Sequence, residues 1–268
     1  MADNIDKNIQ KADIVSDIEG RQYHIALAPG ELAENIILVG EISRAKRAAD
    51  LLDDITSHRA NREYHTFTGS YQGIPVSVMS TGMASGAAEI AVVEIFQITK
   101  SPTLIRVGSC GALRTAVGVG DLVISTGSVR LENTSASYVC DNYPAIAHYE
   151  VIRALQQAAE KQSVAHHVGL TATAPGFYAA QGRQVPNIPI RDPDLPDRLA
   201  TMNVINLEME ASIIFTLSTL KGYRSGAVCA VYANRPLNKF ITQEEKKKAE
   251  RNALLTGLNA LVLCSTAP

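Results

Sequence analysis

Short β-rich runs alternate along this chain with segments of helical periodicity, and this alternation constrains the fold more than any other feature. Strands are predicted at residues 36–39, 76–80, 103–108, 122–125, 168–173, 203–207 and 227–233. Helical patterns are predicted between them, at about residues 42–54, 86–99, 147–162 and 209–221. Such alternation favours a buried sheet covered by helices. We therefore predict an α/β fold of three layers, α/β/α, in which the central layer is a mixed β-sheet.

The two ends of the chain and one internal segment depart from this alternation. A last helix is predicted after Thr242 and Glu245, which have the spacing of a capping box. Residues 1–22 are polar and irregular, and we interpret them as an N-terminal extension to a single domain at residues 23–268. Residues 184–200 are rich in proline, which predicts an active-site flap or a surface excursion.

The composition narrows the class of protein. Hydrophobic residues make up 46% and charged residues 19%, with a formal net charge of −2, as in a soluble globular enzyme. This balance argues against nucleic acid or a membrane surface as a partner, because both favour a basic excess. No signal peptide or membrane span is expected from the apolar runs. The four cysteines lack metal-like spacing and suggest free thiols, mostly buried, in a reducing compartment, so cytoplasm is the expected location.

The first candidate anion site follows the first predicted strand. Gly40 lets a ligand approach the backbone, and the helix that begins after it offers free N–H groups. Arg44 lies in the first turn of that helix, where a cation is unfavourable against the helix dipole, so its presence suggests a bound anion. The alternative interpretation is a turn glycine followed by a solvent-exposed arginine.

Two further arginines stand in unusual contexts. Arg106 interrupts an apolar strand, where an arginine is costly unless it is paired or binds an anion. Ser109 follows it in a small-residue turn at the strand's carboxyl end, the edge at which ligands bind to open α/β sheets. A binding site and a structurally paired arginine both remain open for Arg106. Arg62 lies in NREYHTFTG, just before a strand–turn pattern, and an exposed loop arginine is its simpler interpretation.

In their order and spacing these motifs resemble the nucleoside phosphorylase-I family, and within it the members specific for uridine. The similarity runs from about residue 23 onward. It is carried by the G-E-x-x-R unit at 40–44, Arg62, RVGSCGAL at 106–113, GVGDLVI at 118–124 and SVRL at 128–131. The resemblance implies a phosphate site formed by Gly40, Arg44, Arg106 and Ser109, which Arg62 of a neighbouring subunit would complete. It therefore implies a homo-oligomer that is at least a dimer. A hexamer built from three dimers is the larger alternative.

The segment GFYAAQGR resembles the base-recognition segment of the uridine-specific members. Gln181 can meet an amide edge with both a donor and an acceptor, and Arg183 offers donors to a carbonyl, which suits a pyrimidine dione. Phe177 would stack on or flank the base, with Tyr178 beside it. Apart from the family, the same segment could be an ordinary polar loop.

The segment INLEMEAS resembles the family's ribose-binding motif. On an extended backbone Glu208 and Glu210 point to one side and Met209 to the other. The resemblance implies that Glu210 accepts hydrogen bonds from two sugar hydroxyls, that Met209 packs on the ribose and that Glu208 is a secondary candidate. It also matches His24 to a histidine that reaches the ribose 5′-hydroxyl across the subunit boundary. A glutamate pair at a strand-to-helix junction is the simpler alternative.

Two departures from the family pattern bear on specificity and on ions. Asn234 and Arg235 stand where purine-specific relatives carry an aspartate, which favours a pyrimidine enzyme with Arg235 near the base carbonyl. Some members hold a potassium ion at the dimer interface through the glutamate after the cross-subunit arginine, here Glu63. Ala87 stands where a serine would help, which puts this K⁺ site in doubt.

The resemblance implies reversible phosphorolysis of uridine to uracil and ribose 1-phosphate in pyrimidine salvage. Phosphate would be the co-substrate, no cofactor would be required, and Arg183, Gln181, Arg106 and Glu210 would be the catalytic groups. Three alternatives stay open: a nucleosidase that uses water, a purine nucleoside phosphorylase, and a non-catalytic nucleoside-binding protein on the same scaffold.

Overall fold

The computed structural model describes residues 12–13 and 15–266, and an 11-stranded mixed sheet runs through this part of the chain. The strands are β1 (Asn35–Val39), β2 (Asp54–Asn61), β3 (Tyr64–Tyr71), β4 (Ile74–Ser80), β5 (Thr103–Ala112), β6 (Leu122–Arg130), β7 (Ala145–Ile146), β8 (His166–Thr173), β9 (Val204–Glu208), β10 (Arg224–Asn234) and β11 (Lys239–Phe240). The helices are α1 (Ile42–Ala49), α2 (Ser85–Ile98), α3 (Tyr149–Lys161), α4 (Leu195–Thr201), α5 (Ala211–Lys221) and α6 (Gln243–Thr266), with 3₁₀ turns at Ser135–Ser137 and Ala179–Gln181.

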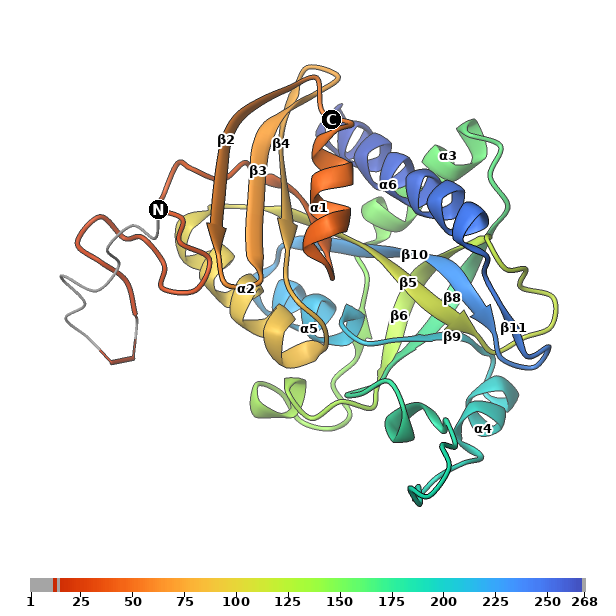
Figure 1. Ribbon diagram of the computed structural model, residues 1–268. Helices are drawn as coiled ribbons and strands as arrows, with labels where there is room; N and C mark the ends of the chain where they lie inside the picture. The colour runs from red at the N-terminus through yellow and green to blue at the C-terminus, as the bar shows by residue number, and fades with distance from the viewer. Residues whose placement is uncertain (1–11, 14, 267–268) are drawn as a thin grey trace.

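Helices cover both faces of the sheet, as the alternation predicted (Figure 1). Side chains alternate along the central strand β1. Ile37 and Val39 pack with α1, α3 and α6, whereas Ile36 and Leu38 pack with α2 and α5. The predicted three-layer arrangement with a mixed sheet is confirmed, and the two hydrophobic clusters are its two interfaces.

One half of the sheet closes on itself, a feature that the alternation did not indicate. β10 pairs with both β5 and β6, β6 pairs with β8, β8 pairs with β9, and β9 pairs back with β5. These five pairings form a closed ring of strands, while β1, β4, β3 and β2 extend from β5 as an open sheet. β5 therefore joins the two halves, and the strand that carries Arg106 lies in the middle of the molecule.

The boundaries of four predicted helices and seven predicted strands agree with the structure to within a few residues, except at 50–54 and at the end of β6, which runs to Arg130 rather than to residue 125. At 50–54 the helical prediction runs on past α1, whereas the chain turns and enters β2. β2 has no apolar alternation because it is a largely exposed edge strand, DITSHRAN. The strand–turn pattern noted after Arg62 corresponds to β3 and the turn into β4.

The last helix begins with the predicted capping box. The Thr242 hydroxyl and backbone N–H both donate to Glu245 Oε2, at 2.7 and 2.9 Å, and the Glu245 N–H donates back to the Thr242 hydroxyl at 3.3 Å. Along α6, Gly257 lies against β5, because a Cβ there would meet Val107 Cγ2 at 2.7 Å. The close approach at Gly257 packs α6 directly on β5.

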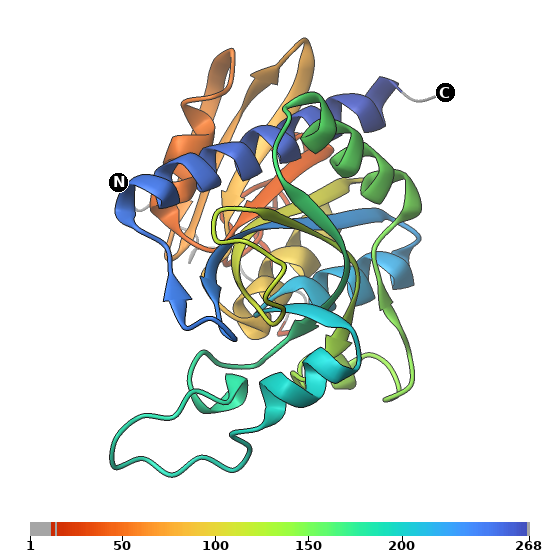
Figure 2. The same ribbon diagram turned by 90° about the vertical axis from the view of Figure 1, so that its right-hand side faces the viewer.

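The two irregular segments differ in how they attach. The predicted extension at 1–22 lies partly outside the described residues, but Arg21 at its end pairs with Glu31 at 2.7 Å. Residues 184–194 project from the body as an exposed loop that leads into α4, which agrees with a surface excursion (Figure 2).

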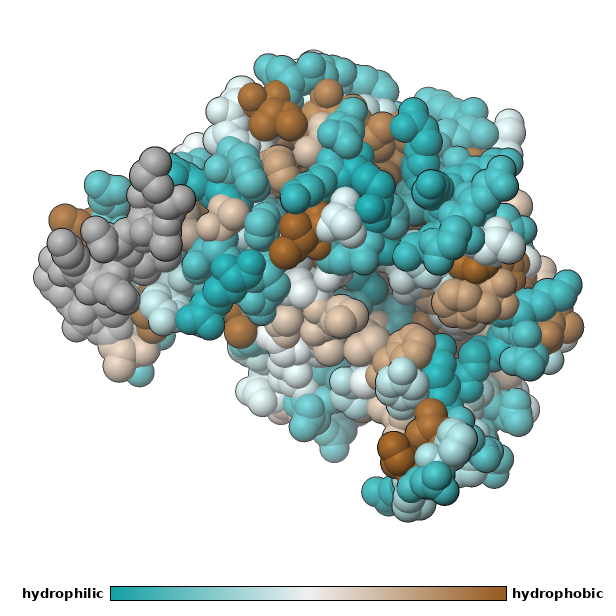
Figure 3. All heavy atoms as spheres, viewed as in Figure 1, coloured by the Kyte–Doolittle hydropathy of each residue, from teal (hydrophilic) through white to brown (hydrophobic). Residues whose placement is uncertain are grey.

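Two further features of the described residues are the state of the cysteines and the character of the helices. All four cysteines are free thiols; Cys110, Cys229 and Cys264 are buried and Cys140 is exposed. Of the helices described, none combines the length and apolarity needed to cross a membrane. On the face shown in Figure 3, hydrophilic side chains predominate and apolar ones lie in separate small groups.

Candidate active site

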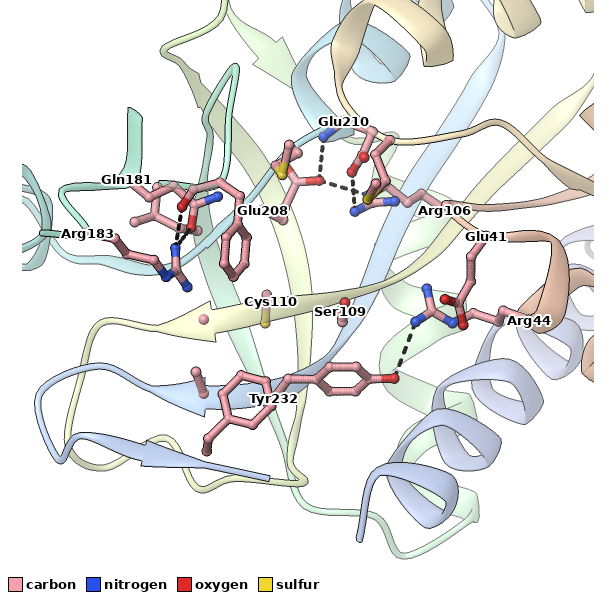
Figure 4. A pocket seen from close by; sticks show the side chains of 18 residues that line it. Glu41, Arg44, Arg106, Ser109, Cys110, Gln181, Arg183, Glu208, Glu210 and Tyr232 are labelled. Atoms are coloured by element: carbon pink, nitrogen blue, oxygen red, sulfur yellow. Dashed lines mark hydrogen bonds and ion pairs between the residues drawn. The ribbon is translucent and has the colours of Figure 1, made fainter. Parts of the chain in front are cut away.

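A pocket opens at the carboxyl ends of β1, β5 and β10, the edge predicted for a ligand. Ten of the predicted site residues line it: Gly40, Arg44, Arg106, Ser109, Phe177, Gln181, Arg183, Glu208, Met209 and Glu210. In Figure 4, Arg44 lies at one end, Gln181 and Arg183 at the other, and Arg106 with the two glutamates on the wall between them. Segments far apart in the sequence thus form one cavity.

Arg44 is buried at the start of α1 and is held by two groups. Its Nε donates to Glu250 Oε2 of α6 at 3.0 Å, and its Nη2 donates to the Tyr232 hydroxyl of β10 at 3.2 Å. Burial opposes the charge, but Tyr232 and Glu250 raise the pKa of Arg44 above its ordinary value. Glu250 is therefore one anion that offsets a cation at this helix end, and Arg44 still faces the pocket.

Arg106 is structurally paired, as one of the two sequence interpretations has it, and it also lines the pocket. Its Nε donates to Glu208 Oε2 at 2.8 Å, and its Nη2 lies 2.5 Å from Glu210 Oε2. Burial works against its charge, but Glu210 and then Glu208 raise the pKa of Arg106 above its ordinary value. Gly108 makes room for this geometry, because a Cβ there would lie 2.7 Å from Arg106 Nη2.

The two glutamates have different partners. Glu208 is tied to the protein by the N–H groups of Glu210 and Ala211, at 2.8 and 2.9 Å, and by the Thr173 hydroxyl at 2.5 Å. Glu210 accepts the Ala84 N–H at 2.7 Å, and burial raises its pKa above the ordinary range against the pull of Arg106. Glu208 thus caps α5, while Glu210 keeps more of its accepting capacity for a ligand.

The opposite end of the pocket is formed by a tight turn of the predicted base-recognition segment. Arg183 donates to the Phe177 carbonyl at 2.8 Å and to the Gln181 side-chain oxygen at 2.5 Å, and its guanidinium lies 3.9 Å from the centre of the Phe177 ring. Burial and the nearby Arg235 lower the pKa of Arg183 to about 10, which leaves it cationic at neutral pH. The segment is therefore an ordered loop that presents an amide and a guanidinium.

Five predicted residues do not line this pocket in the same chain. Tyr178 and Arg235 line an adjoining cleft that shares Arg183, and Arg235 Nη1 donates to the Gln181 carbonyl at 3.0 Å. His24, Arg62 and Glu63 lie elsewhere, near the turn between β2 and β3. Arg62 has a φ of 52° and stacks on Tyr23, and the two residues are joined by a 3.3 Å hydrogen bond.

Several pocket residues were not anticipated from the sequence: Glu41, Cys110, Tyr232, Phe240 and, behind Arg44, Glu250. A signal existed for Glu41 within the G-E-x-x-R unit. For Glu250 there was none, because its neighbours on α6 follow the pattern of a solvated helix face. In the part of the chain that the structure describes, no group of three or more His, Cys, Asp and Glu side chains could hold a metal ion.

Comparison with known proteins agrees with this geometry. A family model described as the phosphorylase superfamily matches residues 35–262. The uridine phosphorylase of Thermococcus kodakarensis is 44% identical over 233 residues, which cover 86% of this chain and 84% of the relative. That of Escherichia coli is 32% identical over 87% of this chain and 93% of its own length. A guanosine phosphorylase from Halorubrum lacusprofundi is 35% identical, over 80% and 84%.

Among solved structures, a Trypanosoma brucei nucleoside phosphorylase described as showing uridine phosphorylase activity is similar, with a TM-score of 0.84 and 26% identity. The match covers 91% of this chain and 98% of that chain. A uridine phosphorylase from Vibrio fischeri has a TM-score of 0.82 and 27% identity, with 90% and 97% covered. The likeness to these two structures therefore extends over 91% and 90% of this chain.

Proposed function

The chain belongs to the phosphorylase superfamily, and we propose that it is a uridine phosphorylase. In this proposal the phosphate, the ribose and the uracil lie side by side along one pocket. The reaction is the reversible phosphorolysis of uridine to uracil and ribose 1-phosphate, in pyrimidine salvage. One observation carries the proposal: Gln181 and Arg183 lie in the same pocket as Arg44 and Arg106. Hydrogen-bonding groups that suit a pyrimidine dione therefore share one cavity with two arginines that suit a phosphate.

The phosphate would bind at the Arg44 end. Arg44 and Arg106 are buried and cationic, Ser109 adds a hydroxyl, and the N-terminus of α1 after Gly40 adds backbone N–H groups. Because the two arginines already have fixed partners, the charges are in place before the substrate arrives. Such preorganised charge stabilises a transition state better than charge that must move into position.

The ribose and base would follow along the wall of the pocket. Glu210 accepts hydrogen bonds from the sugar hydroxyls, Met209 packs on the ring, and Phe177 flanks the base. As the glycosidic bond breaks, positive charge grows on the ribose and negative charge on the uracil. The phosphate stabilises the first and captures the anomeric carbon, while Gln181 and Arg183 stabilise the second. Arg235, beside Gln181, supports the base end, and Tyr178 borders it.

A neighbouring subunit would complete the site, so the working unit is at least a dimer. His24 and Arg62 lie together outside the pocket of their own chain, as residues donated to a partner would. Glu63 follows Arg62 and is the candidate ligand of an interfacial K⁺. The free thiols support a reducing, cytoplasmic location.

The experiment that tests the base assignment is the substitution Arg183→Ala. Loss of this charged contact should cost about 3 kcal/mol of transition-state stabilisation, roughly a hundredfold in kcat/KM for uridine. Arg198→Ala is the matched control, because Arg198 is an exposed arginine of α4 that pairs with Asp192 outside the pocket. Circular dichroism checks that both variants fold. Turnover of Arg183→Ala near that of the wild type would contradict the assignment.

A further inference from the structure

A carboxylate outside the pocket, Glu94 of α2, organises the segment that carries His24. Glu94 is only 8% exposed, and its two oxygens accept three groups from this segment. The His24 N–H lies 3.0 and 3.1 Å from the two oxygens, the Ile25 N–H donates at 2.8 Å, and the imidazole Nδ1 lies 2.6 Å from Oε1. Burial of a carboxylate is costly unless its oxygens accept hydrogen bonds, so these contacts hold the segment against α2.

The rest of His24 is fixed from another side. Asn61, the last residue of β2 and the neighbour of Arg62, donates to the carbonyls of Tyr23 and His24 at 3.1 and 2.8 Å. The ring packs edge-on against Tyr23, with centroids 4.9 Å apart. Both the backbone and the ring of His24 are therefore anchored, although its side chain remains 30% exposed.

The contact with Glu94 also decides how the imidazole can bind a ligand. An ionised carboxylate only accepts hydrogen bonds, so Nδ1 must carry the proton that it donates. Nε2 is then the remaining polar atom of a ring that is 30% exposed, and within residues 12–13 and 15–266 it has no hydrogen-bond partner. An oriented imidazole with one free nitrogen is suited to a single hydroxyl of a ligand.

We propose that Glu94 is a positioning residue for nucleoside binding: it holds His24 so that Nε2 meets the ribose 5′-hydroxyl of a nucleoside bound in the neighbouring subunit. This inference rests on the proposed function and on the shared site. Glu94 does not contact the substrate itself. Its effect should therefore appear only with substrates that carry the 5′-hydroxyl.

The test compares uridine with 5′-deoxyuridine, which lacks this hydroxyl, in the presence of phosphate. The measured quantity is the ratio of kcat/KM for uridine to that for 5′-deoxyuridine. His24→Ala should lower this ratio about tenfold, the scale of one lost hydrogen bond. Glu94→Ala should lower it about as far, through the KM for uridine. In the His24→Ala background, Glu94→Ala should leave the ratio unchanged, because Glu94 acts through His24.

Glu34→Ala is the matched control. Glu34 likewise accepts two backbone N–H groups, those of Lys100 and Ser101 at 3.0 Å each, but holds no histidine. This variant should leave the substrate ratio unchanged. A Glu94→Ala variant that loses activity equally on both substrates would show a structural role only and overturn the inference. If the wild-type protein cleaves neither nucleoside with phosphate, the proposed function itself fails.

Discussion

Each arginine of the pocket already has protein partners before a substrate binds. Arg44 is held by Glu250 and Tyr232, Arg106 by the two glutamates at the carboxyl end of β9, and Arg183 by the oxygens of its own turn. From the sequence, a paired arginine and a ligand-binding arginine were competing interpretations. The structure shows that pairing does not remove these side chains from the cavity, and the pairs are what keep three cations oriented in a buried site.

At the same scale, the sequence could indicate which residues line the pocket, but not which side chains hold those residues in place. The ten pocket residues belong to motifs whose chemistry can be named from short segments. Glu250 and Glu94 lie on helices far along the chain from Arg44 and His24. No local pattern predicts such contacts, because they depend on how α6 and α2 pack on the sheet.

The glycine before α1 offers a test of close ligand approach. A Cβ at Gly40 would meet only the Gly82 carbonyl, at an ordinary 3.6 Å, so the fold has room for Gly40→Ala. The added methyl should instead compete with phosphate at the N-terminus of α1. We expect an unchanged melting temperature and a KM for phosphate raised about tenfold, equal to about 1.4 kcal/mol. An unchanged KM for phosphate would remove Gly40 from the site.

At the scale of elements, strands and helices that are buried could be predicted, and those at the edge could not. β2 was missed because its exposed residues carry no apolar period, and its pairing with β3 depends on contacts across a turn. The closed ring around β5 was missed for a different reason. Alternation indicates that strands share a sheet, but not that β10 pairs with β5 and β6 at once.

The segment before β1 should show a pH-dependent attachment. The hydrogen bond from Arg21 is the main cause that lowers the pKa of Glu31 from 4.5 to about 2. Ionised Glu31 therefore stabilises the folded state above pH about 4.5, and this contribution disappears as the pH falls toward about 2. Glu31→Gln should lower the melting temperature at neutral pH, with a difference from wild type that shrinks across this window.

The control for this measurement is Glu19→Gln. Glu19 also approaches Arg21, but at 3.9 Å and with a side chain that is 71% exposed. It should leave the melting temperature unchanged at every pH. A difference for Glu31→Gln that stays constant down to pH about 2 would show that the carboxylate charge does not matter.

At the scale of the whole molecule, the proposed shared site would need two subunits for each working pocket. Arg183→Ala inactivates a pocket, whereas Arg62→Ala removes a side chain that would be donated to the partner's pocket. In a mixed dimer one pocket is intact and also receives an intact donor. Equal co-expression should give half mixed dimers, and so about a quarter of wild-type activity. Activity no higher than that of the separate variants would contradict a shared site.

The most direct measurement follows the products of the purified chain with uridine, with and without phosphate, and with guanosine in parallel. Because one relative is a guanosine phosphorylase, the base must be tested as well as the co-substrate. We predict that uridine yields uracil and ribose 1-phosphate in equal amounts, and only when phosphate is present. Release of uracil from uridine should be faster than release of guanine from guanosine. Uracil release without phosphate, or cleavage of guanosine but not uridine, would contradict it.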